Sequence, residues 1–450
     1  MRIRIGSRFG PRHGRGRILK SDRTDRVLII GGGVSGIASA IRLRHRGFVV
    51  TLVERSEFPR EKICGCCLGA AGLAALDSIG LGQGVRQRGI VTESFVGYLQ
   101  TRRRQGRFGS NGPRCRSPIR LPIQPGVAIS RSVLDTYLRD AAIDAGVEVR
   151  QPHEAQVVDS NAKVVTVRHR RAGDSWTTTN EYALVIIATG LTGIFQGKPT
   201  AESYRTSPLR WELPWVESPH GPLGVATHLP GDHRLAKSWP IDDGDIQMVC
   251  GDDGYVGLVR LPGGAIDIAA ALPSRTKTRS TRADLSNSPS VRIGRLLESH
   301  PDFGVNFVSD LNAWLQQDAS WMTAPPLRRT RQVGRGRAVA IGDCARYVEP
   351  LTGEGMTWGI ESGIAVADLC HETVSGEREL DLAKQWARRL DTLQSKRRIV
   401  CRGVTSALRS RYIRRVAQFS LHRFGWLAGP LTRGLASGPK FVPTEIRRGG

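Results

Sequence analysis

The chain has no uninterrupted run of about 18 apolar residues, so no transmembrane helix is expected. Its first residues also lack the apolar core of a secretory signal. Eight cysteines are present, but none has zinc-ribbon spacing. Cys64, Cys66 and Cys67 crowd together without a second Cys/His cluster to complete four ligands, so no metal site is predicted. These absences argue against a disulfide framework and favour a reducing cytoplasm.

Acidic residues are scarce, with 41 Asp and Glu against 66 Lys and Arg, which gives a net charge of +25. Residues 1–24 carry eight Lys or Arg and one Asp, and residues 384–448 carry sixteen Lys or Arg and two acids. The body between these basic ends is close to neutral, so no specific nucleic-acid partner is expected. We expect residues 1–24 to be a disordered tail. The C-terminal charge suits an anionic membrane surface or an acidic partner.

One stretch near the N-terminus is typical of a nucleotide-binding unit. An apolar strand over 27–30 leads into a glycine turn, a helix over about 34–46 and a second strand over 48–53. The glycines allow a tight turn and close approach of a pyrophosphate, and the helix N-terminus attracts its charge. Glu54, at the end of the second strand, can accept hydrogen bonds from a ribose. The residues predicted to bind the cofactor here are Gly31, Gly33, Val34, Ser35, Gly36, Glu54 and Arg55.

A second motif, some 300 residues further on, narrows the choice of cofactor. The apolar run 338–341 is followed by Gly342 and Asp343, and then by a loop that opens a helix at about residue 356. This pattern resembles the second FAD motif of flavoproteins with the p-hydroxybenzoate-hydroxylase-type fold. In that family the Asp binds the ribityl chain, and the helix N-terminus stabilises negative charge on the reduced flavin. The resemblance implies that FAD is the cofactor and adds these residues to its site: Gly342, Asp343, Pro350, Gly353, Gly355 and Met356.

Further segments resemble the geranylgeranyl reductase-like group of this superfamily. Residues 59–65 match its P-x-x-K-x-C-G segment, and this match places Lys62 and Cys64 near the cofactor. The helix entry at Arg131 and the turn that ends at Gly190 also match, which implies that both residues bind FAD. The Asp-Gly that usually follows this turn is absent, so direct use of NADPH, as in the aromatic hydroxylases, is not supported.

The expected fold is therefore α/β, with a Rossmann-like FAD-binding domain interrupted by a sheet-rich substrate domain and followed by a basic helical region. The expected FAD-binding segments are 25–95, 125–195 and 330–375; the substrate domain takes 96–124 and 196–329, and the helical region 376–450.

The resemblance implies an FAD-dependent oxidoreductase. We expect hydride transfer at flavin N5 that reduces or dehydrogenates a small apolar substrate, whether isoprenoid, lipidic or polyketide-derived. Two alternatives stay open: a monooxygenase or halogenase that acts through a C4a-hydroperoxide, and a flavoprotein that passes electrons to a membrane quinone. The external reductant is either NADPH or an electron-donor protein. Cys64 is the candidate proton donor, or else a small apolar residue packed beside the flavin. Two histidines of the middle segment, His220 and His228, are interpreted as surface or core residues.

Residues 386–435 mix apolar side chains with arginine. An approximate helical stripe of apolar residues runs from Leu390 to Val416. Such a helix can cap the FAD domain, or it can lie on the inner face of a membrane as a peripheral contact.

Overall fold

A computed structural model describes residues 26–101, 114–115, 118–176, 178–191, 213, 215–217, 221–273, 288–324, 326–327, 329–347, 353–375, 381–423, 429 and 438–443. Three of the sequence predictions fall on residues outside this part of the chain: the basic tail 1–24, Pro350 and His220.

The first sheet carries the nucleotide motif. Its inner strands β1, β2, β11 and β20 are buried and pair in parallel, and β1 lies at the centre, between β11 and β2. The register places Ile29 opposite Ile186 on one side and Leu52 on the other. In spatial order the strands are β19 (Gly334–Arg335), β20 (Ala338–Ala340), β11 (Leu184–Ile187), β1 (Arg26–Ile30), β2 (Val49–Val53) and β7 (Glu148–Arg150). The predicted strand–glycine turn–helix–strand unit is confirmed.

Helices α1 and α9 pack closely against each other beside this sheet. A Cβ on Gly363 would lie 2.3 Å from the Ser35 carbonyl oxygen, and one on Gly359 would lie 2.6 Å from Ser35 Oγ. Glycine at both positions is therefore needed for this close approach. The helices of this half of the molecule are α1 (Val34–His45), α2 (Ala70–Asp77), α3 (Gly82–Arg86), α4 (Arg131–Asp144) and α9 (Gly355–Ser375).

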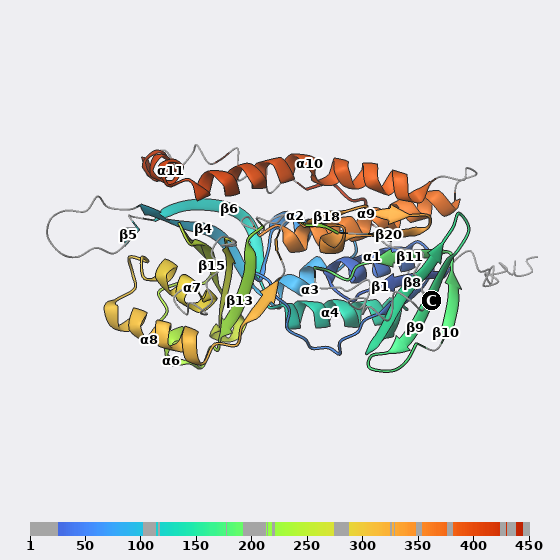
Figure 1. Ribbon diagram of the computed structural model, residues 1–450, viewed down its shortest axis with the longest axis horizontal. Coiled ribbons are helices and arrows are strands. Elements are labelled where there is room, and N and C mark those ends of the chain that lie inside the picture. Colours follow the sequence, from blue (N-terminus) through green and yellow to red (C-terminus); the bar gives the residue numbers. More distant parts are fainter. Residues whose placement is uncertain are drawn as a thin grey trace, which may run out of the picture.

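A nine-stranded, mainly antiparallel sheet forms the other half of the molecule (Figure 1). Side chains alternate along its strands. On β4, Val96 and Tyr98 enter a core with the helices on one side, whereas Phe95 and Leu99 line a cavity on the other. Its strands are β17 (Met322–Ala324), β13 (Leu223–Leu229), β16 (Ile266–Leu272), β15 (Gly254–Arg260), β14 (Asp245–Gly251), β4 (Ile90–Thr101), β6 (Ile119–Ala128) and β3 (Cys67–Leu68), and β5 (Arg114–Cys115) pairs with β4.

The helices that pack on this second sheet were not predicted from the sequence. They are α6 (Arg234–Lys237), α7 (Pro289–Leu297) and α8 (Val305–Gln317), and α7 has the Ser288 side chain as its N-cap. The described part of the chain also contains two smaller sheets. They are made of β8 (His153–Ser160), β9 (Val165–Arg171) and β10 (Thr178–Tyr182), and of β12 (Trp215–Glu217), β18 (Arg329–Arg331) and β21 (Arg346–Tyr347).

Helices α10 (Leu382–Arg409) and α11 (Arg411–Arg423) run along the top of both halves (Figure 1). Trp386 is fully buried on α10, and its Nε1 donates a 2.7 Å hydrogen bond to the carbonyl of Ala340. On α11, the buried Arg414 donates to the carbonyls of Gln100 and Gly251 in the second sheet. The C-terminal helices therefore cap the FAD domain and join it to the other half.

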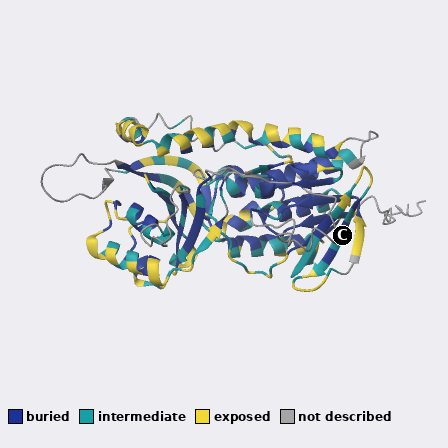
Figure 2. Cartoon of the chain, viewed as in Figure 1, coloured by how far each residue is buried: buried dark blue, intermediate teal, exposed yellow. Residues whose placement is uncertain are grey.

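The predicted apolar stripe does not stay on one face. Leu390 is buried, but Ile399 of the same helix is exposed, and so are Tyr412, Ile413 and Val416. The last three belong to a new helix, because α10 ends at Arg409 and α11 begins at Arg411. Figure 2 shows the outer face of both helices as largely exposed. None of the helices in the described ranges combines the length and apolarity that a bilayer crossing requires.

Candidate functional site

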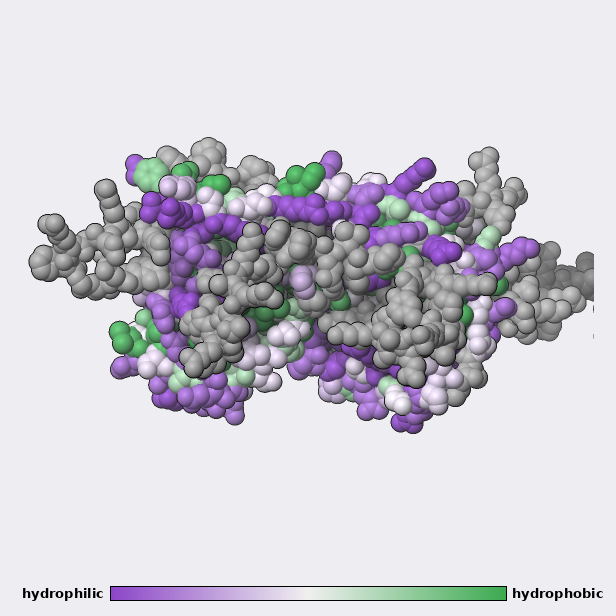
Figure 3. Space-filling view, in the orientation of Figure 1, coloured by the Kyte–Doolittle hydropathy of each residue, from purple (hydrophilic) through white to green (hydrophobic). Residues whose placement is uncertain are grey.

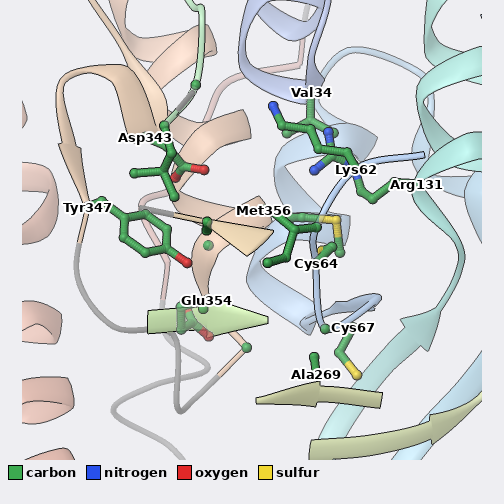
Figure 4. Close-up of a pocket in the computed structure, with 18 of the residues that line it drawn as sticks. Val34, Lys62, Cys64, Cys67, Arg131, Ala269, Asp343, Tyr347, Glu354 and Met356 are labelled. Carbon is green, nitrogen blue, oxygen red and sulfur yellow. The ribbon is translucent and has the colours of Figure 1, made fainter. Parts of the chain in front are cut away.

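A cavity of about 880 Å³ extends from the glycine turn of the first sheet to the nine-stranded sheet and the C-terminal helices. Its two ends differ in chemistry. The end at the first sheet is lined by glycines and charged side chains, and the other end is lined by apolar ones. Of the predicted site residues, Ser35 and Glu54 line the charged end, and Cys64 and Met356 also face the cavity (Figure 4).

The glycine turn is built as the motif requires. Gly31 has a φ of +112°, and a Cβ there would lie 2.4 Å from the carbonyl oxygen of Ala188. A Cβ on Gly36 would lie 2.0 Å from the carbonyl oxygen of Gly31. Gly33 is the N-cap of α1 and has no side chain that could cap the helix. The N–H groups of the first turn of α1 are therefore open to an anion.

Glu54 is buried at the end of β2 and holds the turn in place. It accepts a 2.8 Å hydrogen bond from the Gly32 N–H and a 3.0 Å hydrogen bond from the Ser56 N–H. Arg60 also lies 3.3 Å from Glu54 Oε2. Because each carboxylate oxygen accepts more than one hydrogen bond, Glu54 keeps capacity for a ribose hydroxyl.

Two cations face Asp343 across the charged end (Figure 4). Arg131 begins α4 and makes a two-pronged ion pair with Asp135, at 2.9 and 2.8 Å. A Cβ on Gly33, the N-cap of α1, would lie 3.6 Å from Lys62 Nζ and 3.9 Å from a guanidinium nitrogen of Arg131. Lys62 and Arg131 therefore lie beside the N-terminus of α1, where a pyrophosphate would need them.

Burial shifts the pKa values of these groups. It lowers the pKa of Lys62, and the nearby Arg131 lowers it further. Burial disfavours the charge on Arg131, but Asp135 raises the pKa of this guanidinium. Burial also raises the pKa of Asp343, although Lys62 and Arg131 oppose the shift. An anion bound between these cations would favour their charged forms.

The N-terminus of α9 reaches the cavity through the predicted second motif. Gly342 has a φ of +59°, and its N–H donates a 3.0 Å hydrogen bond to Ser362 Oγ. Gly353 has a φ of +72°, and Gly355 is the first residue of the helix. The helix therefore points its positive end at the cavity, as the sequence predicted.

A buried ion-pair cluster, missed in the sequence, anchors this helix end. Arg397 of α10 donates a 3.2 Å hydrogen bond to Glu354 Oε2 and a second one to Glu361. All three side chains are at least nine-tenths buried. Because Glu354 directly precedes α9, the cluster fixes the helix N-terminus relative to α10.

The unfolding free energy should depend on the protonation of Glu354. Burial raises its pKa from 4.5 to about 7. The folded state therefore binds this proton more tightly than the unfolded state. The stabilisation that protonated Glu354 gives to the folded state is complete below pH 4.5 and is lost as the pH rises through about 7. In urea titrations between about pH 5 and 8, the free energy of unfolding should fall less steeply with pH in Glu354→Gln than in the wild type. Glu372→Gln, an exposed change on the same helix, should keep the wild-type slope. Equal slopes for wild type and Glu354→Gln would contradict the assignment.

Three thiols lie beside the cavity. A hydrogen bond with Cys66 lowers the pKa of Cys64 to about 7. The same bond, together with burial, raises the pKa of Cys66, and burial raises that of Cys67. Of the three, Cys64 is the thiol most easily ionised, and Figure 4 shows it next to Met356.

The far end of the cavity is apolar. The nine-stranded sheet contributes Phe95, Leu99, Ile119, Leu121 and Met248, while the C-terminal helices contribute Val404, Leu408, Ala417 and Leu421. Among the described lining residues of this end there is no charged side chain. We call this region the apolar arm.

The charged end of the cavity fits a dinucleotide. Glycines at 31, 33 and 36 leave room against the backbone, two cations face the helix N-terminus, and the end of α9 lies further along the wall. A second glycine-opened helix lies on the same cavity, and in the flavoproteins that the second motif resembles this helix N-terminus lies at the flavin. The protein accordingly has the p-hydroxybenzoate-hydroxylase-type fold, and FAD is its cofactor.

Comparisons with known proteins agree with this class. Residues 24–196 match the FAD binding domain family. A menaquinone reductase of Mycobacterium tuberculosis is 25% identical over 380 residues, covering 80% of this chain and 78% of that protein. A kynurenine 3-monooxygenase of Xanthomonas campestris is 24% identical over 353 residues, covering 76% and 71%. The solved structure of the halogenase PltM with phloroglucinol and FAD has a TM-score of 0.64 at 14% identity, and the match covers 94% of this chain and 88% of PltM.

Several residues of the site carried no clear signal in the sequence. Arg60 and Asp135 join Glu54 and Arg131 in one ion-pair network, with Arg60 3.5 Å from Asp135. Tyr347 lines the cavity from within the second motif, between Asp343 and the loop that opens α9. Only Asp135 had a pattern that could have revealed it, because it stands four residues after Arg131 on a predicted helix.

Proposed function

We propose that the protein reduces or dehydrogenates an apolar, chain-bearing substrate, as in the geranylgeranyl reductase-like group. The observation that supports this most is the apolar arm, which continues the cofactor cavity between the nine-stranded sheet and the C-terminal helices. A chain in this arm would meet only apolar and uncharged polar side chains, so its transfer from water would be favourable along its length. The similarity to a menaquinone reductase points to the same substrate class.

FAD, when bound, supplies the hydride chemistry. The protein would bind the pyrophosphate through α1, Lys62 and Arg131, and the flavin end through the α9 N-terminus. The apolar arm would hold the substrate chain and exclude water from the reacting end. Cys64 stands between the two regions, where it can give a proton to the substrate.

The experiment uses the holoprotein, photoreduced under argon with EDTA as the sacrificial electron donor, so that the physiological reductant does not have to be known. It is then mixed with a naphthoquinone that carries a prenyl chain, or with the same quinone without the chain. We expect the flavin to be reoxidised at least about 10-fold faster, at low quinone concentration, by the prenylated compound, since a further 1.4 kcal/mol of binding is enough. The proposal would be wrong if the two quinones reoxidise the flavin at equal rates, or if neither quinone does and only oxygen reoxidises it.

Oxygen chemistry on an aromatic substrate is the second candidate, and the similarity to a kynurenine 3-monooxygenase favours it. It predicts oxygen uptake stimulated by a small aromatic compound, with one oxygen atom recovered in the product. Either NADPH or an electron-donor protein would supply the electrons. Measuring how fast each of the two reduces the flavin shows which one is the donor.

Cys64→Ala should lower the rate of substrate reduction by roughly 100-fold if the thiol donates the proton, the lower end of the range for general acids. The FAD spectrum should stay that of the wild type, because Cys64 lies beyond the pyrophosphate site. Cys64→Ser, which keeps a weaker donor, should retain part of the rate. A loss below about twofold in both variants would assign Cys64 to packing.

We also propose that α11 touches an anionic membrane, from which a chain-bearing substrate would come. Its exposed side mixes apolar and basic residues, as Figure 3 shows along the upper edge of the molecule. The exposed residues of this surface are Arg411, Tyr412, Ile413, Arg415, Val416, Phe419 and Arg423. Apolar side chains flanked by arginines are the pattern of an interfacial helix.

Replacing Val416 and Phe419 together by Asp should weaken sedimentation with phosphatidylserine-containing vesicles by at least about 10-fold. The control is Val305→Asp, a change of an even more exposed apolar residue on α8, at the other side of the molecule. If the double variant and the Val305→Asp control bind vesicles equally well, α11 does not contact the membrane. Vesicle binding that changes neither with salt nor with the substitutions would rule out an electrostatic contact through α11.

A further inference from the structure

Three side chains with metal-binding atoms meet outside the FAD site. Cys66 Sγ, His228 Nε2 and Asp267 Oδ1 all lie within 4.8 Å of one another. Cys66 lies just before β3, and His228 and Asp267 are directly paired across strands β13 and β16. The sequence predicted no metal site because these residues are some 160 and 200 positions apart from the cysteine.

The cluster is poorly satisfied without a further atom. Asp267 is 1% exposed on an otherwise apolar strand, and its Oδ1 has no hydrogen-bond partner among the described residues. His228 Nε2 lies 2.9 Å from this oxygen, which is an ion-pair distance. A buried carboxylate oxygen without a hydrogen bond costs free energy unless a cation meets it.

The backbone also holds Cys66 in place at a cost. Its φ is +49°, a value that residues other than glycine rarely adopt. Among the residues that the structure describes, no other non-glycine residue has a positive φ. The side chain is fully buried and lies 3.8 Å from His228 Nε2. A strained residue of this kind persists where the surroundings fix it, and such residues gather at functional sites.

We propose that Cys66, His228 and Asp267 bind a divalent transition-metal ion of the zinc type. Tetrahedral zinc with ordinary bond lengths separates its ligand atoms by about 3.3 to 3.6 Å. The observed 3.8 Å and 2.9 Å separations fall on either side of that range, so small side-chain rotations would close the site. Three protein ligands leave a fourth position for water or another ligand.

The surroundings of His228 match those of a ligating histidine. Its Nε2 faces the cluster, while its other ring nitrogen, Nδ1, lies 3.7 Å from Glu61 Oε2. Metal-bound histidines commonly present the second nitrogen to a carboxylate, which fixes the ring orientation. Glu61 is half-exposed and His228 is partly exposed, so this side of the cluster lies near the protein surface.

A bound ion would join the loop that carries Lys62 and Cys64 to the nine-stranded sheet. That loop leads from the FAD site to β3 of the nine-stranded sheet, and Ala269, two residues after Asp267, lines the cavity (Figure 4). The ion would thus fix the distance between the cofactor and the substrate wall. This inference does not depend on which substrate is used, so it stands or falls separately from the proposed function.

The test uses the holoprotein, cleared of metal with a chelator and titrated with zinc by calorimetry. We expect one zinc per chain. X-ray absorption at the zinc edge should show one sulfur at about 2.3 Å and nitrogen or oxygen neighbours at about 2.0 to 2.2 Å. Cys66→Ser should remove the sulfur signal, and His228→Asn should weaken binding by at least about 10- to 100-fold.

Cys67→Ser is the matched control, since this neighbouring thiol lies outside the cluster, and it should keep the sulfur signal. The FAD spectrum and circular dichroism show whether each variant folds. If Cys66→Ser does not fold, the wild-type absorption spectrum and the His228→Asn titration decide. No zinc binding, zinc without a sulfur neighbour, or a sulfur signal that survives in Cys66→Ser would overturn the site and leave an ion pair between His228 and Asp267.

Discussion

Arg397→Ala should lower the free energy of unfolding by about 3–5 kcal/mol, because it strands two buried carboxylates without their cation. Arg397 and Glu354 are 6% and 10% exposed as side chains, and Glu361 is 2% exposed, so little water can replace the lost contacts. The loss should be largest near pH 8, where Glu354, with its pKa of about 7, is charged. Urea unfolding at that pH measures it.

The same variant should also bind FAD more weakly. Glu354 directly precedes α9, so freeing it lets the helix N-terminus move away from the flavin end of the cavity. Arg389→Ala is the control, because this arginine is exposed on the same helix, α10, and should change the unfolding free energy by less than about 0.5 kcal/mol. A loss below about 1 kcal/mol for Arg397→Ala would show that the cluster does not hold α9 and α10 together.

Gly257→Leu should lower kcat/KM selectively for substrates with a long chain. Gly257 lies on β15 and lines the apolar arm, and a Cβ there would have its nearest contacts at 3.8 Å from Ala269 O and 3.9 Å from Met248 Cε. The strand therefore tolerates the new side chain, which fills the arm instead. We expect kcat/KM to fall at least about 10-fold for a prenylated quinone and less than about twofold for the quinone without its chain.

The control for this change is Gly304→Leu at the N-cap of α8, where an added Cβ meets nothing within 4 Å. It should leave both substrates unaffected. An equal loss for both quinones in Gly257→Leu would mean that the arm does not hold the chain, and the substrate would then have to lie elsewhere in the cavity.

The FAD end of the site could be predicted from the sequence because local constraints define it. The glycines at 31 and 36 each face a backbone oxygen within 2.4 Å of where a Cβ would stand, so no other residue fits. Glu54 and Asp343 follow buried strands whose apolar runs are short and clear. Such positions leave a pattern in the sequence because each depends on its nearest neighbours in the chain.

The rest depends on contacts between distant segments. Arg397 meets Glu354 across 43 positions, and His228 meets Cys66 across 162. No spacing rule links such pairs, and the exposed and buried arginines of α10 look alike in sequence. Helices α7 and α8 were missed for a related reason: a short helix packed on a sheet takes its burial from the sheet, which local periodicity does not reveal.

The position of α10 and α11 has a consequence for how the protein is made. The glycine turn and the first two strands leave the ribosome early, whereas Val404, Leu408, Ala417 and Leu421 are added more than 350 residues later. Until then the apolar arm lacks one wall and lies open to water. In the nascent chain an apolar groove therefore stays uncovered beside a nearly complete nucleotide site, until α10 and α11 have been synthesised and supply its missing wall.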